Sequence, residues 1–258
     1  MVSAEIVIGI VAFFASLLTF FCGFGLGTLL LPVFAMFYDV KSAVLLTASV
    51  HLFNNLFKFS LIFKHVDWRK ALSFSVFALP ASFIGAWLLS GITLADEFSF
   101  QCHWGSYVFT FSLVSFGLGL LMVFFGIWEL IPRFQSLRIS EKWFAPIAFL
   151  SGLIGGFSGH QGALRTVVLS QAKLDKQAFI ATGIVIACLV DLTRIPIYLS
   201  ETSIHEFAFQ AFLPAVLPAF GGAWLGNRFL KKMEFKWLKW LIGVYLIAMG
   251  VLVLLNVA

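Results

Sequence analysis

The stretch "GGFSGHQGALR", residues 155–165, places polar and helix-breaking residues between two strongly apolar flanks. Its four glycines permit a tight turn and close backbone approach, and Arg165 follows the last of them by three residues. A helix that starts after such a turn presents unpaired backbone N–H groups, which favour a bound anion. The planar guanidinium of Arg165 suits two oxygens of one oxyanion. His160 and Gln161, within the turn, either donate to a substrate or satisfy the turn's own backbone.

Asp191 and Arg194 also fall inside an apolar segment. A charge at the bilayer centre costs about 2.5–3.5 kcal/mol on insertion scales, so each requires a partner or an aqueous cavity. Because they are three residues apart on one helical face, they can form an ion pair. Two interpretations stay open: a structural pair that orients the segment, or an Arg194 that binds an anion beside Asp191. For Arg165, the alternative to anion binding is hydrogen bonding to backbone carbonyls.

A polar stripe is predicted in a third apolar segment, at "HLFNNLFK". His51, Asn54, Asn55 and Lys58 recur at the spacing of one helical face. Facing the interior of a bundle, these donors would suit a hydrated anion path. Hydrogen bonding between helices is the alternative.

The composition identifies an integral membrane protein. The 258 residues are 61% hydrophobic and 11% charged, with a mean hydropathy of +1.01, which leaves too few polar residues to cover a soluble domain. We expect helices, because isolated strands cannot span lipid and a barrel would show short alternating segments. The apolar stretches of membrane-spanning length are 5–38, 42–63, 71–95, 105–131, 143–170, 177–200, 207–229 and 237–257.

The remaining composition excludes several kinds of site. The net charge of +5 is explained by basic cytoplasmic loops, so no nucleic-acid partner is expected. The three cysteines, Cys22, Cys102 and Cys188, show no metal-ligand spacing and no pairing pattern. We therefore expect neither a metal nor a cofactor, and the expected partners are a small anion and the lipid bilayer.

The two halves of the chain repeat each other at an offset between 135 and 138 residues. Three matches in the same order indicate a duplication, which predicts repeats at 1–135 and 136–258 within one membrane domain. The matching pairs are "GFGLGTLLLP" (23–32) with "GHQGALRTVV" (159–168), "DVKSAVLLTAS" (39–49) with "LDKQAFIATGI" (174–184), and "LPASFIGAWLL" (79–89) with "LPAFGGAWLG" (217–226).

Loop charges predict how the chain crosses the membrane. Basic loops are cytoplasmic, which places the chain inside at Lys142 and outside at Glu201. Two apolar segments lie between these residues, so one segment must enter the membrane and return, at the glycines around 155–162. The same reasoning predicts that the first segment turns back at "CGFGLG" (22–27). The predicted fold is an all-α integral membrane protein with two inverted repeats, each a re-entrant helical hairpin plus three transmembrane helices, and both termini external.

The two glycine motifs, in a duplicated apolar chain of this length, resemble the sulfite exporter TauE/SafE family over nearly the whole chain. The second repeat has Val167 or Val168 where the first has Pro32, and Leu26 and Gln161 replace glycines of the all-glycine form of the motif. The resemblance implies an inner-membrane carrier for small sulfur-containing anions such as sulfite and organosulfonates. The motif positions are Gly23, Gly25, Gly27 and Pro32 in the first half, and Gly159 with Gly162 in the second.

We therefore predict a multi-pass secondary transporter that moves sulfite or a short organosulfonate across the inner membrane by alternating access. The site would lie where the two glycine turns approach each other at mid-membrane, and Asp191 and His51 are candidates for coupling or ion pairing. A passive anion channel is the alternative, and an enzyme is not expected, because Ser158 and His160 do not share a helical face. The predicted substrate-binding residues are Gly25, Gly27, Asn54, Asn55, Gly159, His160, Gln161, Arg165 and Arg194.

Overall fold

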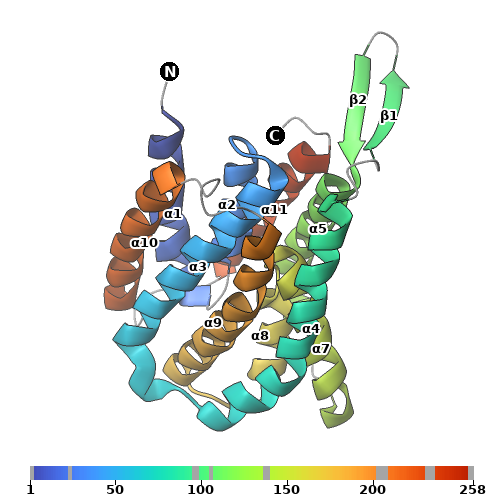
Figure 1. Ribbon diagram of the computed structural model, residues 1–258. Helices are drawn as coiled ribbons and strands as arrows, with labels where there is room; N and C mark the ends of the chain where they lie inside the picture. The colour runs from blue at the N-terminus through green and yellow to red at the C-terminus, as the bar shows by residue number, and fades with distance from the viewer. Residues whose placement is uncertain are drawn as a thin grey trace.

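The fold was analysed in a computed structural model (Figure 1). It describes residues 3–22, 25–94, 99–104, 107–135, 140–201, 209–229 and 236–254. The elements are α1 (Ala4–Cys22), α2 (Leu26–Ala35), α3 (Val40–Ile62), η1 (Phe63–His65), α4 (Trp68–Leu94), β1 (Ser99–Trp104), β2 (Tyr107–Ser112), α5 (Leu113–Leu130), α6 (Pro132–Gln135), η2 (Glu141–Trp143), α7 (Phe144–Ser158), α8 (Gly162–Ser170), α9 (Lys176–Glu201), α10 (Phe209–Phe229) and α11 (Lys236–Leu254).

The predicted helical membrane protein is confirmed. Among the described residues, parts of α4, α5, α9 and α10 are long and apolar enough to cross a membrane. Large apolar side chains such as Val76 and Leu217 are exposed on the helical surface, as expected of positions that face lipid. In α9, 67% of the spanning window is buried inside the protein, against 39–44% in the other three helices. Helix α9 is therefore the most buried of these four, and it is central because it packs against α1, α3, α4, α7 and α8.

Both glycine stretches interrupt their helices, as predicted. Gly25 and Gly159 have φ angles of 109° and 82°, a left-handed conformation that glycine adopts without a steric penalty. The Ser151 hydroxyl donates to the Gln161 carbonyl at 3.0 Å, although ten residues of continuous helix would separate them by about 15 Å. The chain therefore folds back between α7 and α8. Gly23, in the first motif, lies outside the described residues.

The helices pack in pairs drawn from the two halves of the chain: α4 with α7, α1 with α10, α5 with α11, and α3 with α9. Between α5 and α11, glycines bring the backbones into reciprocal contact. A Cβ at Gly126 would lie 2.8 Å from the Gly243 carbonyl oxygen, and one at Gly243 would lie 2.9 Å from that of Gly126. Gly119 and Gly250 make the same reciprocal contact, at 2.8 and 3.0 Å.

A β-hairpin, absent from the sequence-based expectation, precedes α5. Strands β1 and β2 pair antiparallel, from Ser99 opposite Ser112 to Trp104 opposite Tyr107. The predicted apolar helix 105–131 therefore begins later, at Leu113. Two physical reasons apply: "YVFTFS" is rich in aromatic and β-branched residues that favour strands, and the remaining 18 residues of α5 still extend about 27 Å. The hairpin extends beyond the helical body, at the end where α1 begins and α11 ends (Figure 1).

The predicted topology can be tested by cysteine labelling. In a background without the native cysteines, Val40→Cys at the start of α3 should react with a membrane-impermeant maleimide added outside. Trp68→Cys at the start of α4 should react only from inside, because α3 separates the two positions. Position 98, expected outside with position 40, and position 230, expected inside with position 68, lie outside the described residues. Reaction of positions 40 and 68 from the same side would contradict the predicted topology.

Candidate functional site

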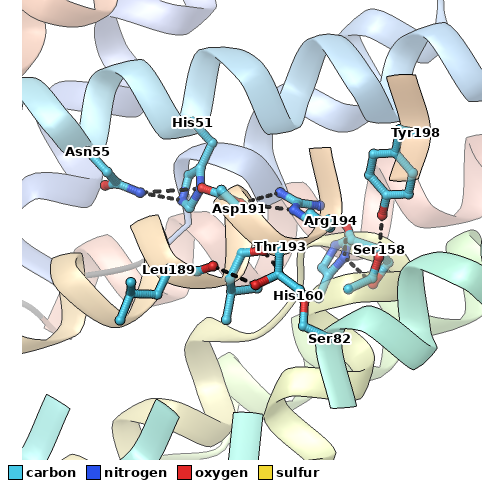
Figure 2. A network of polar contacts seen from close by, with 12 residues as sticks. His51, Asn55, Ser82, Ser158, His160, Leu189, Asp191, Thr193, Arg194 and Tyr198 are labelled. Carbon is cyan, nitrogen blue, oxygen red and sulfur yellow. Dashed lines mark hydrogen bonds and ion pairs between the residues drawn. The ribbon is translucent and has the colours of Figure 1, made fainter. Parts of the chain in front are cut away.

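The centre of the site is the carboxylate of Asp191 on α9, which is fully buried. Its Oδ2 atom lies 2.6 Å from Nδ1 of His51 on α3. Its Oδ1 atom accepts a hydrogen bond of 2.9 Å from Nε of Arg194 and lies 2.8 Å from Nη2 of the same residue. The side-chain nitrogen of Asn55 is 3.2 Å from the His51 ring (Figure 2). The short contact to a carboxylate assigns the Nδ1 proton to His51.

This network connects the two glycine turns. A Cβ at Gly27 would lie 3.5 Å from Cδ2 of the His51 ring, and one at Gly159 would lie 3.1 Å from Nη1 of Arg194. A Cβ at Gly27 would make an ordinary van der Waals contact with His51, whereas a Cβ at Gly159 would crowd the Arg194 guanidinium. Both side chains therefore lie directly behind their turns. Because His51 and Arg194 bind the same carboxylate of Asp191, the two breaks are held in a fixed relation to each other.

Arg165 lies on α8 and is 2% exposed. Its charge interacts with that of Asp191, whose carboxylate is bound by Arg194. Over the described residues, three cationic side chains and two carboxylates are buried, which leaves one excess positive charge when the histidines are neutral. An anion would compensate this excess. The five residues are Lys58, Arg165 and Arg194 with Glu129 and Asp191.

The second glycine turn fixes the ring of His160. Its Nδ1 atom lies 3.1 Å from both the carbonyl oxygen and the hydroxyl of Ser158. The ring stacks on Phe125 of α5, with centroids 5.9 Å apart and planes 10° apart. Within the described part of the chain, Nε2 of His160 and both amide atoms of Gln161 have no hydrogen-bond partner. These polar atoms are buried, so they are suited to bind a ligand.

On the other side of α3, Asn54 links this helix to α1. The amide orientation that satisfies its neighbours places the nitrogen 2.9 Å from Ser16 Oγ and the oxygen 3.1 Å from Lys58 Nζ. Lys58 also lies 3.5 Å from Thr19 Oγ1. The polar stripe of α3 therefore divides: His51 and Asn55 join the Asp191 network, whereas Asn54 and Lys58 bind α1.

The two turns line one cavity, although they lie in different halves of the chain. Gly25 and Thr28 come from the first turn, and His160, Gly162 and Ala163 come from the second. The cavity is narrow, about 10 Å³, which is near the minimum for one water molecule. Its other walls come from α5 and α11, through Phe125, Glu129, Ile242 and Leu246.

A wider cavity of about 180 Å³ follows along α5. Ser115, Leu118 and Met122 of α5 line it. They lie on the same helical face as Phe125 and Glu129 of the narrow cavity, and they precede them in the helix. The exposed Asp39, which caps the start of α3, also lines it; α3 starts at the end of the molecule where α1 begins and α11 ends (Figure 1). The wider cavity thus lies between that end and the glycine turns.

The model of the sulfite exporter TauE/SafE family matches residues 8–253. The chain belongs to this family. No curated protein and no solved structure gives a significant match. Membership confirms the resemblance carried by the two glycine motifs and makes the chain a multi-pass membrane transporter of sulfur-containing anions. In this member of the TauE/SafE family, the motifs form the two helix breaks that line the cavity.

Sequence reasoning missed Glu129, which is 5% exposed and lines the cavity. It stands near the end of the predicted segment 105–131. A carboxylate inside an apolar run could have indicated a functional site there. Among the predicted residues, Gly25 and His160 line the cavity directly. Gly27 and Gly159 instead lie beside the network behind it, and the missing side chain of Gly159 leaves room for Arg194.

Asp191→Asn should lower the thermal stability of the protein. The substitution keeps the shape of the side chain but leaves Arg194 without its carboxylate, and breaking a buried pair costs about 3–5 kcal/mol. We expect a lower midpoint in a thermal-unfolding assay of the detergent-solubilised protein. Glu141→Gln, an exposed carboxylate, is the control and should leave the midpoint unchanged. An Asp191→Asn midpoint equal to that of the wild type would contradict the structural role of this network.

Gly159→Ala should destabilise the turn, whereas Gly117→Ala should not. At Gly159 a Cβ meets both the left-handed backbone, at about 1–2 kcal/mol, and the Arg194 guanidinium. At Gly117, on α5, a Cβ has no described atom within 4 Å, and alanine is the better helix former. The same thermal-unfolding assay compares the two variants. Equal midpoints for both would argue against a strained turn at Gly159.

Proposed function

We propose that this chain is a secondary transporter that moves sulfite or a short organosulfonate across the inner membrane by alternating access. The anion binds between the two glycine turns. The observation that carries the proposal is the shared cavity, to which each half of the chain contributes one broken helix. A network with excess positive charge lies behind the turns.

The backbone at both turns supplies hydrogen-bond donors for an oxyanion. The helical hydrogen bonds of α2 begin with Leu29 N to the Gly25 carbonyl, and those of α8 begin with Arg165 N to the Gln161 carbonyl. The N–H groups of residues 26–28 and 162–164 therefore come before the first helical hydrogen bond and are available to a ligand. Two helix N-termini that face one cavity favour a small anion between them.

Side chains divide into those that contact the anion and those that support the turns. His160 and Gln161 supply donors through their unsatisfied side-chain atoms, and Arg165 supplies charge from the first turn of α8. Arg194 acts from behind Gly159, where its ion pair with Asp191 holds it. Asn54 holds α3 against α1, and Asn55 contacts the ring of His51 on the same helix.

The pairing of helices supports an inverted repeat with 1–135 and 136–258 as its halves. The proposed counterparts in the two halves are α1 and α7, α4 and α10, α5 and α11, and α3 and α9. When each helix is replaced by its counterpart, the pair α1–α10 becomes α7–α4, and the pairs α5–α11 and α3–α9 become themselves, so the same pairs are packed. The reciprocal glycine contacts of α5 and α11 agree with a two-fold axis between these helices. Such a repeat supports two states that expose the same site to opposite sides. In the described part of the chain, the cavity at the turns is separate from the wider one, which favours a carrier over a passive channel.

Transport in proteoliposomes tests the function and the site together. We expect saturable uptake of [³⁵S]sulfite at pH 8 that unlabelled sulfite inside the vesicles accelerates. Arg165→Ala and Arg194→Ala should each reduce this uptake at least tenfold, and Lys142→Ala, in an exposed position, should not. Monodisperse elution in detergent checks that the variants fold. Normal uptake by both arginine variants would contradict the site, and picoampere-scale conductance would favour a channel.

A further inference from the structure

Tyr198 of α9 connects the ion-pair network to the second glycine turn. Its side chain is 6% exposed, and its hydroxyl donates a hydrogen bond to the carbonyl oxygen of Gly156 on α7 (Figure 2). The Arg194 guanidinium, one helical turn before Tyr198 on α9, interacts with the same tyrosine side chain. Tyr198 therefore contacts both the arginine of the network and the helix that ends at the turn.

The Gly156 carbonyl needs a donor from outside its own helix. In a continuous helix it would accept a hydrogen bond from the N–H group four residues later. Helix α7 ends before that position, and Gly159 N–H donates to the Gly155 carbonyl instead. In the described part of the chain, no backbone N–H group donates to the buried Gly156 carbonyl. A buried carbonyl without a partner is unfavourable, so the Tyr198 hydroxyl replaces the hydrogen bond that the turn removes.

Helix packing around Gly156 does not depend on this hydroxyl. A Cβ at Gly156 would clash with the Ser82 carbonyl oxygen of α4, so the two backbones are in direct contact. The Ser82 hydroxyl in turn lies 3.5 Å from the Val190 carbonyl of α9. The end of α7 is thus packed against α4 by its backbone and joined to α9 by the tyrosine. Removing the hydroxyl alone releases the second contact and leaves the first in place.

Three side chains on one face of α9 contact the two glycine turns or their partners. Asp191, Arg194 and Tyr198 follow one another at i, i+3 and i+7. Asp191 binds His51 beside the first turn, and Arg194 lies behind Gly159 in the second. Tyr198 contacts the second turn at a further point, the last turn of α7. Two contacts with α9 therefore place the segment that carries the proposed anion donors.

We propose that Tyr198 is a positioning residue of the anion site, whose hydroxyl fixes the entry of the α7–α8 turn so that His160 and the N–H groups of residues 162–164 face the cavity. The inference rests on the proposed anion site. Donors that are held in place before binding need no ordering when the anion arrives. Without the hydroxyl, the turn has more conformations, and only the fraction with the correct geometry binds the anion. The loss is therefore in anion affinity.

The test is the concentration dependence of [³⁵S]sulfite uptake into proteoliposomes at pH 8. Tyr198→Phe keeps the ring and removes only the hydroxyl. It should raise KM about fivefold, the effect expected of one lost hydrogen bond, with Vmax per folded protein unchanged. Thr193→Val is the matched control, because it removes a hydroxyl from the same helix whose hydrogen bond, 2.9 Å to the Leu189 carbonyl, stays within α9. Its KM should equal that of the wild type.

The outcomes separate the tyrosine from the transport function. Absence of saturable uptake by the wild type would overturn the proposed anion site itself. With saturable uptake present, a lower Vmax of Tyr198→Phe at unchanged KM would show a structural role only and overturn the positioning role. Replacing Tyr198 by p-aminophenylalanine retains a donor at the same place and should keep the wild-type KM. A raised KM in that variant would overturn the proposal even if Tyr198→Phe fails to fold.

Discussion

The buried carboxylate of Asp191 is the constraint on which the rest of the site depends. A charge at this depth is tolerated only when it is paired, and Asp191 is paired with groups from two helices, His51 on α3 and Arg194 on α9. These partners lie beside Gly27 and Gly159, so the carboxylate holds both helix breaks. The central position of α9 follows from this role, because the helix that carries the carboxylate must contact both halves of the chain.

Holding the breaks together creates the cavity. The first turns of α2 and α8 then present their unbonded N–H groups to the same space. Neither turn alone would surround a ligand, which gives a physical reason for a duplicated chain.

Local patterns predicted the parts of this site that depend on neighbours in the chain. The Asp191–Arg194 pair follows from i, i+3 spacing, and the breaks follow from counting basic loops. What sequence reasoning could not predict is long-range: His51 meets Asp191 across 140 positions, and Asn54 turns away from Asn55 toward α1. Strand β2 was missed because an apolar run has the same composition in a strand as in a membrane helix. Glu129 was missed although its charge was visible in the sequence.

The most direct test of the central claim is the position of a bound oxyanion. Selenite has the geometry of sulfite and a selenium atom that can be located by anomalous scattering in crystals of the protein. The account predicts one anomalous peak between the turns, with selenite oxygens about 3 Å from backbone nitrogens of residues 26–28 and 162–164. A peak beside Lys58 and Asn55, in the small cavity that these residues line with Thr19, and none between the turns would contradict it.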